Sequence, residues 1–347
     1  MIYAIILLSL ALFWGFIQSL KLNSVTKKKI FIIFAFLLLI LVSGLRHISI
    51  GIDTMNYFNS FMFFEQKSLQ EIITNSELEK GYLLLQYFIY NIFGNFQFLL
   101  IFVAIFQMVV VAKLILKHSV NPLLSTILFI VFGFYTFGFS AIRQTLAISF
   151  VVISLSFIER RKFYSFIVTI LIAASFHISA LIFIPSYFIA KMKIERKNLV
   201  LLVFSAVIVF LSRNYIIQLL NQYARIPYAS TETGGYLMYL FLVISVILGV
   251  IFRKQLIEKN PNNSYFMQMM IMTTILMPIT MFHPAVMRLF QYFFIFMIIY
   301  IPNLLHSIKD HLLRYIAIFS YILTGLILFF GTTIEVNLLQ EYLFFWL

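Results

Sequence analysis

The residues best suited to chemistry first gather in the stretch Ser43 to Tyr57, which reads SGLRHISIGIDTMNY. It begins where an apolar run, Ile30 to Val42, ends. The stretch contains a guanidinium at Arg46, a carboxylate at Asp53 and a phenol at Tyr57. Charged groups at the end of a membrane-spanning helix are stable where they reach the interface or a water-filled cavity. We therefore predict that this stretch lines a polar site at a membrane surface.

Further polar residues interrupt the apolar sequence at Glu79, Arg143, His177 and Arg288. The arginine guanidinium presents a fixed fork of donors that matches phosphate oxygens. Several converging arginines would suit a diphosphate, because its negative charge grows as it leaves. An imidazole can take a proton from a hydroxyl near neutral pH. His283, which precedes Pro284, is interpreted as structural.

This set of groups predicts glycosyl transfer from a lipid diphosphate to a sugar hydroxyl. Long apolar grooves between helices would hold the polyprenyl tail. The sequence has neither a glycine-rich phosphate loop nor a dinucleotide-binding fingerprint. Asp53 and Glu79 are carboxylates of the kind that binds divalent cations. Because arginines can neutralise a diphosphate alone, the sequence allows a metal but does not imply one, and we expect no other cofactor.

The composition requires that these groups be positioned by membrane helices. The chain has 347 residues, of which 63% are hydrophobic and only 11% charged, whereas a soluble protein is nearer half apolar and a quarter charged. We therefore predict an all-α, polytopic integral membrane protein, with 1–347 as a single transmembrane domain. The net charge of +13 indicates basic loops facing the cytoplasm and anionic lipid, rather than a nucleic-acid partner.

About twelve apolar runs, with ten to twelve crossings as the range, are predicted to span the bilayer. They are Ile2–Leu20, Ile30–Leu45, Phe96–Ala112, Leu123–Phe139, Leu146–Ile158, Phe163–Ser175, Ile178–Ala190, Leu199–Ile217, Tyr236–Phe252, Tyr265–Met281, Leu289–Leu304 and Tyr315–Phe330. The fifth to seventh runs are short enough to be tilted or re-entrant, and Phe163–Ala190 is predicted to turn near His177. Because basic loops face the cytoplasm, the lysines of the first loop place that loop on the cytoplasmic side, and the candidate site residues then lie on the outer side of the membrane.

Two outer segments follow from this orientation. Residues 46–95 form the longer one, in which Tyr82–Phe93 is too short to cross a membrane and is predicted to be an interfacial helix ended by Gly94. Residues 212–235 form the second, which has the composition of a loop that covers a site.

Four short motifs resemble a known family. SGLRHISIGIDTMNY resembles the "LR…vG-Dt-nY" signature near the start of the EpsG family of exopolysaccharide and O-antigen polymerases, which is related to Wzy. EKGYLLL, from Glu79, resembles its second signature. AIRQ, which contains Arg143, and FHISAL, which contains His177, resemble its central "R-…-HxSAL" pair. Arg288 with Gln291 and Tyr292 resembles its late Arg-Tyr motif.

The resemblance implies a polymerase of repeat units linked to undecaprenyl diphosphate, in the bacterial inner membrane. It implies an architecture related to lipid-dependent glycosyltransferases and a site on the extracytoplasmic side. Its partners would be the lipid-linked oligosaccharide, membrane lipid and, if one binds, a chain-length regulator. The resemblance also assigns roles to the candidate residues. The diphosphate would be held by Arg46, Arg143 and Arg288. The first candidate for general base would be His177, with Asp53 and Glu79 as rivals or orienting groups. The sugar would be contacted by Tyr57, Gln144 and Tyr292.

Two other classes of protein remain as alternatives. A flippase for lipid-linked oligosaccharide would also use arginines, but should carry polar residues through the depth of the bilayer. A membrane acyltransferase would need a carboxylate beside its histidine, and His177 has none close to it in the sequence.

Overall fold

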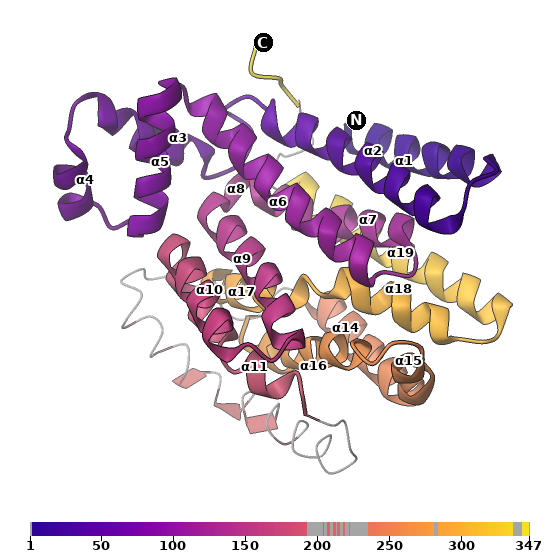
Figure 1. The fold of residues 1–347 in the computed structure, drawn as a ribbon. Coiled ribbons are helices and arrows are strands. Elements are labelled where there is room, and N and C mark those ends of the chain that lie inside the picture. Colours follow the sequence, from indigo (N-terminus) through magenta and orange to yellow (C-terminus); the bar gives the residue numbers. More distant parts are fainter. Residues whose placement is uncertain are drawn as a thin grey trace.

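The computed structural model describes residues 2–192, 235–280, 284–335 and 342–346, together with scattered positions between 204 and 222. Within these residues every regular element is helical, as predicted (Figure 1). The first half contains α1 (Ile2–Ser19), α2 (Ser24–Gly44), α3 (Thr54–Met62), η1 (Phe63–Glu65), α4 (Leu69–Asn75), α5 (Lys80–Phe93), α6 (Phe96–His118), α7 (Pro122–Val131), α8 (Phe134–Ser140) and α9 (Ile142–Glu159). The second half contains α10 (Phe163–Phe176), η2 (Ile178–Phe183), α11 (Ser186–Ile189), α14 (Tyr236–Ile251), α15 (Arg253–Lys259), α16 (Asn263–Thr280), α17 (Pro284–Phe294), α18 (Met297–Ser307) and α19 (His311–Glu335).

Several of these helices are long and apolar enough to cross a bilayer. Among the described residues α1, α6, α9 and α19 meet that requirement, and up to seven spans result if three bent helix pairs are each one span. The pairs are α7 with α8, bent by 44°, α14 with α15, bent by 75°, and the end of α17 with α18, bent by 43°. The chain is therefore a multi-pass membrane protein. Twelve crossings remain a prediction.

The helix ends follow from short polar or glycine-containing sequences between the apolar runs. Asn23, Asn95 and Asn121 cap α2, α6 and α7, and the side chain of each accepts a hydrogen bond from a backbone N–H of the first turn. Gly94 ends α5 with a φ of 62°, a conformation that costs glycine little. Gly133, with a φ of 78°, separates α7 from α8 inside the run predicted as one span, Leu123–Phe139.

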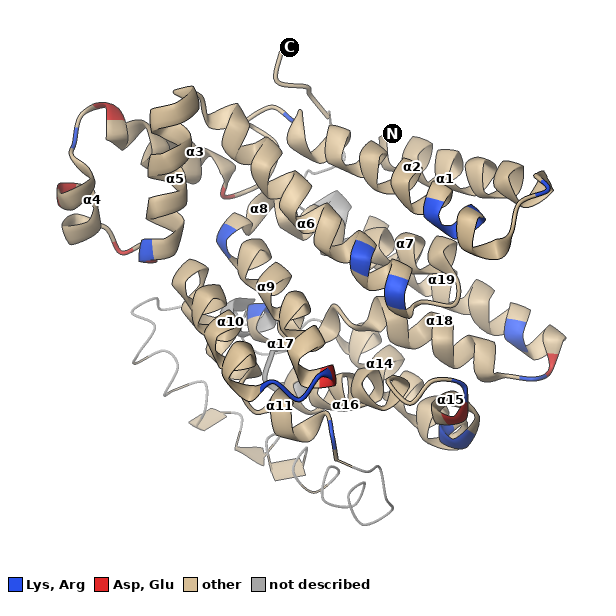
Figure 2. Ribbon diagram, viewed as in Figure 1, with Lys and Arg blue, Asp and Glu red and all other residues tan. Residues whose placement is uncertain are grey.

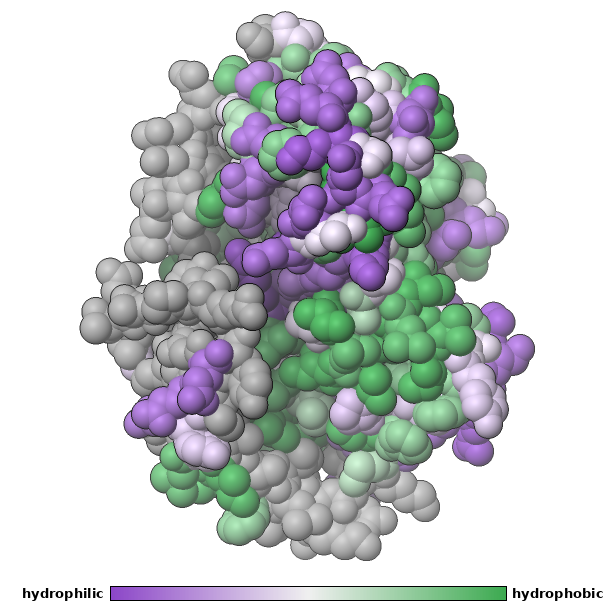
Figure 3. Space-filling model, turned by 90° about the vertical axis from the view of Figure 1, so that its left-hand side faces the viewer, coloured by the Kyte–Doolittle hydropathy of each residue, from purple (hydrophilic) through white to green (hydrophobic). Residues whose placement is uncertain are grey.

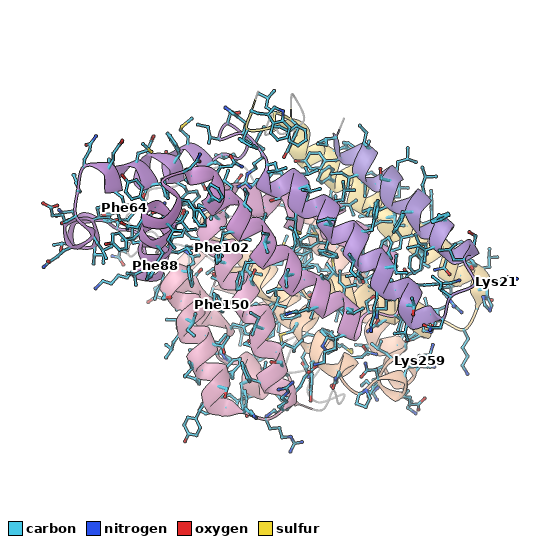
Figure 4. All side chains as sticks on the ribbon, turned by 45° about the horizontal axis from the view of Figure 1, so that its top comes forward. Lys21, Phe64, Phe88, Phe102, Phe150 and Lys259 are labelled. Atoms are coloured by element: carbon cyan, nitrogen blue, oxygen red, sulfur yellow. The ribbon has the colours of Figure 1, made fainter. Side chains whose placement is uncertain are left out.

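The two ends of the molecule differ in charge and in structure. α3, α4 and α5 form a lobe at one end, whereas Lys and Arg gather at the opposite end around the α1–α2 connection, the last turns of α6, and α15 (Figure 2). Viewed from the α3–α5 end, hydrophilic residues gather in the upper part of the coloured surface, and a patch of hydrophobic residues lies below them (Figure 3). Lys21 and Lys259 lie far from Phe64 and Phe88, which belong to the lobe (Figure 4).

The lobe contains the helix predicted to lie at the interface. On α5, Leu83, Gln86 and Ile89 are buried, whereas Phe88 and Ile92 are 61% and 69% exposed. An exposed apolar stripe on a short helix is typical of a helix lying in the bilayer interface. The predicted outer loop 212–235 lies outside the described residues, apart from a few scattered positions and Gly235.

Candidate active site

One carboxylate joins the two central polar candidates. Glu79 lies immediately before α5, and its Oε2 forms an ion pair with the guanidinium of Arg143 at the start of α9. Its Oε1 lies 2.8 Å from Nδ1 of His177 and also accepts the backbone N–H of Ile178. Three segments that are far apart in the sequence therefore meet at a single side chain. Because Glu79, Arg143 and His177 are each about one-fifth exposed, solvent or a ligand can reach them.

The contacts of Glu79 keep it ionised. Burial raises the pKa of the carboxyl, but the hydrogen bond from His177 and the charge of Arg143 outweigh burial and hold the pKa at about 2. An ionised carboxylate only accepts hydrogen bonds, so the hydrogen between the two residues lies on Nδ1 of His177. In the neutral ring Nε2 then carries a lone pair, and it has no hydrogen-bond partner among the described residues. This is the geometry of a general base oriented by a carboxylate.

A second pair of charges lies beside this cluster. The guanidinium of Arg288, on α17, lies 3.7 Å from the carboxylate of Asp53, just before α3. Arg288 is about half exposed. The ring of Tyr57, on α3, lies against the first pair, because the Arg143 guanidinium lies over it at 5.9 Å from the ring centroid. Burial raises the pKa of Tyr57, and the charge of Arg143 and its hydrogen bond to the phenol oppose that rise.

Close backbone contacts bring these segments together. A Cβ atom at Gly81 would clash with Ser175, so glycine lets α5 approach the end of α10 closely enough for Glu79 to reach His177. His177 itself lies in extended backbone between α10 and η2, where the sequence predicted a turn. On the other side, Thr54 Oγ1 donates to the carbonyl oxygen of Phe139 at 2.9 Å and so ties the start of α3 to α8.

Arg46 lies apart from the contacts that join Glu79, Arg143 and His177, and its predicted binding of diphosphate stays a prediction. It is 1% exposed, donates to the carbonyl oxygens of Ser43 and Phe139, and lies over the Phe139 ring at 5.0 Å. The physical reason is its position just after α2, where the unsatisfied carbonyls at a helix C-terminus attract a cation. Its backbone pairs with Phe344 near the C-terminus of the chain. Arg46 therefore stabilises the fold beneath the site.

The residues predicted to contact sugar are also buried. Gln144 is 2% exposed and donates through Nε2 to the carbonyl oxygen of Arg288. Tyr292 is fully buried, and its hydroxyl lies 2.9 Å from Oγ of Ser179, in η2. Tyr57 is 7% exposed. Packing turns the side chains of Gln144 and Tyr292 inward, where they fix α17 against α9 and η2. Direct contact of these residues with sugar stays a prediction.

An apolar cavity of about 490 Å³ opens next to Arg288. Helices α7, α8, α14, α17 and α19 surround it, and Ser140 and Gln291 are among its few polar lining residues. The guanidinium and the apolar walls together would suit a molecule with an anionic head and a hydrocarbon tail. His283 lies outside the described residues. In the part of the chain that the structure describes, no group of three or more His, Asp or Glu residues could hold a metal.

The arrangement combines an imidazole oriented by a carboxylate, a guanidinium held by the same carboxylate, and a second, more exposed guanidinium paired with Asp53. The sequence predicted five of these residues as candidates, namely His177, Glu79, Arg143, Arg288 and Asp53. It did not predict which of their side chains form contacts with one another. Gly81 and Ser175 were not predicted to matter, although the glycine inside EKGYLLL was a signal of close backbone approach. No carboxylate lies close to His177 in the sequence, but the fold brings Glu79, immediately before α5, next to its imidazole.

Comparison with known proteins identifies the family. A family model described as the EpsG family matches residues 29–345, a range that contains every residue of the cluster. Neither a curated protein nor a solved structure matches the chain significantly. The resemblance predicted from four short motifs is confirmed over nearly the whole length. The chain belongs to the EpsG family.

Proposed function

We propose that this protein is a Wzy-like polymerase of an exopolysaccharide, capsule or O-antigen. It transfers a growing glycan from undecaprenyl diphosphate to a sugar hydroxyl of a lipid-linked repeat unit. Membership of the EpsG family supports polysaccharide synthesis. The single observation that carries the reaction type is the side chain of Glu79, which joins His177 to Arg143. It brings a proton acceptor and a diphosphate-binding group to the same place.

His177 acts as the general base in this proposal. Its Nε2 takes the proton of the acceptor hydroxyl while Nδ1 keeps its hydrogen bond to Glu79. The hydroxyl oxygen forms a bond to the anomeric carbon of the donor, and the bond between that carbon and the diphosphate oxygen breaks. Undecaprenyl diphosphate leaves with the bonding electron pair. Glu79 stabilises the imidazolium that forms and remains ionised itself.

The two arginines that reach the cluster bind the diphosphate. Arg288 is the more exposed and borders the apolar cavity, which would accept the first isoprenoid units of a lipid tail. Arg143 is held beside His177 by Glu79, so its charge lies near the breaking bond. Asp53 pairs with Arg288 and orients that guanidinium.

We place the site on the extracytoplasmic side of the bacterial inner membrane. The cluster lies where the α3–α5 lobe meets α9 and α10, and most lysines and arginines lie at the opposite end (Figure 2). The positive-inside rule assigns that basic end to the cytoplasm. No nucleotide sugar is available outside, which agrees with a lipid diphosphate as the donor.

Two observations separate this proposal from its alternatives. The charged cluster lies at one end of α9 and α10, whereas a flippase needs polar groups along a path through the bilayer. An acyltransferase would also require the carboxylate that Glu79 supplies to His177, so this pair does not distinguish the two classes. Membership of the EpsG family favours glycan polymerisation over acyl transfer.

A reconstituted assay tests the proposal. The purified protein would receive lipid-linked repeat units in liposomes, and the products would be separated by length. A ladder of lipid-linked oligomers together with released undecaprenyl diphosphate is expected. Movement of intact repeat units across the bilayer without any ladder would refute polymerisation and support the flippase.

A further inference from the structure

A groove between α6 and α9 lies apart from the candidate active site. Its volume is about 540 Å³. At one end Phe106 of α6 meets Phe150 of α9, with ring centroids 5.1 Å apart. At the other end an ion pair between Lys117 and Glu159 joins the same two helices. Figure 4 shows Phe102 and Phe150 on these two helices, near the first of these contacts.

The length of the groove fits one leaflet of a bilayer. Its α6 wall includes Phe106, Val109, Lys113 and Lys117, a spacing of three or four residues that keeps the wall on one side of the helix, and it ends at His118. At 1.5 Å per residue this wall is about 18 Å long. The hydrocarbon core of a bilayer is about 30 Å thick, so one leaflet contributes about 15 Å. A single acyl chain therefore matches the groove.

The charge of the groove is concentrated at one end. Lys113 and Lys117 lie one helical turn apart on its rim, and the rest of the lining is mostly apolar. Lys117 is engaged by Glu159, whereas Lys113 is exposed and has no ion-pair or hydrogen-bond partner in the described part of the chain. The basic residues 160–162 follow Glu159 directly. The rim is thus net positive where the hydrocarbon ends.

We propose that the groove binds one anionic phospholipid of the leaflet at the basic end of the molecule. One acyl chain lies between α6 and α9, and the phosphate is bound by Lys113 and Lys117. Charge complementarity selects the anionic headgroup, and the length of the apolar wall selects a lipid chain. This site is separate from the cavity beside Arg288, because no residue lines both.

Native mass spectrometry of the purified full-length protein in detergent tests this proposal. The protein would be titrated with dioleoyl phosphatidylglycerol and, separately, with dioleoyl phosphatidylcholine. Lys113→Gln should weaken phosphatidylglycerol binding about fivefold, the order expected for one basic residue near an anionic headgroup, and leave phosphatidylcholine binding unchanged. Lys21→Gln is the matched control, because Lys21 is an exposed lysine at the same end but does not line the groove.

A second variant tests the groove without changing its charge. Ser156 lines the groove, and its hydroxyl bonds only to the Ile153 carbonyl of its own helix, so Ser156→Leu fills space without leaving a partner unpaired. It should displace the acyl chain and lower binding of phosphatidylglycerol. Equal affinity for the two lipids, or wild-type binding in both variants, would overturn the proposal. Displacement of bound phosphatidylglycerol by equimolar undecaprenyl phosphate would overturn it as well, and would assign the groove to the substrate chain.

Discussion

Replacing Glu79 with Gln removes one negative charge and nearly preserves the shape of the side chain. The imidazole of His177 would keep only a neutral amide oxygen as the acceptor of its Nδ1 hydrogen, which orients the ring and stabilises the imidazolium less than a carboxylate does. Arg143 would lose its ion pair and would face an amide NH2 group. A positioned general base contributes about 10²–10⁴ to a rate. We therefore expect kcat for chain growth to fall about 100-fold or more. KM for the lipid substrate should change much less, because both guanidinium groups remain.

The same substitution should lower stability in a pH-dependent way. The pKa of Glu79 falls from 4.5 to about 2, which corresponds to about 3 kcal/mol, and solvent screening of this partly exposed group reduces the contribution to about 1–2 kcal/mol. Because the pKa is depressed in the folded state, this stabilisation is present above pH 4.5. It is lost as the pH falls toward 2. Glu79→Gln should therefore be less stable than wild type at pH 7 and indistinguishable from it near pH 2.

Two measurements check these expectations. The oligomer ladder reports turnover, and thermal unfolding in detergent between pH 7 and pH 2 reports stability. Glu77→Gln is the matched control, since Glu77 is an exposed carboxylate two residues away. A normal ladder from Glu79→Gln would refute the role of the carboxylate in orienting the base. A stability difference that stays constant with pH would refute the ion-pair argument.

Four further substitutions separate catalytic from structural roles, and each is measured by the oligomer ladder and by thermal unfolding. Arg143→Ala should abolish chain growth while the protein still inserts, and normal long chains would argue against diphosphate binding. His177→Gln should lose turnover but retain binding of the lipid substrate, so unchanged turnover would remove it as the base. Gly81→Ala should push α5 from Ser175 and reduce turnover at least about tenfold, since misplacing catalytic groups by about 1 Å costs up to 100-fold. Arg46→Met should retain the ladder but lose about 1–3 kcal/mol of stability through its hydrogen bonds to backbone carbonyls, and loss of the ladder in a stably folded variant would return Arg46 to the site.

The amino-acid sequence was sufficient for the class of protein and for the candidates. Continuous apolar runs can satisfy their backbone polar groups in lipid only as helices, so composition alone predicted the architecture. Local signals also located structural features, such as the end of the short helix at Gly94 and the break before His177. Four spaced motifs were enough to predict the family. Each of these properties depends on neighbours in the sequence.

Only the tertiary structure decided which side chains meet. Glu79 and His177 are 98 positions apart, and their contact depends on how closely α5 packs against α10 at Gly81. Other contacts bury Arg46 against the end of α2 and Phe139, and Gln144 against the Arg288 carbonyl, although Gln144 directly follows Arg143 in the sequence. The direction of a side chain is set by the helices around it, which come from distant parts of the sequence. The chemical groups could thus be predicted one by one, and their arrangement could not.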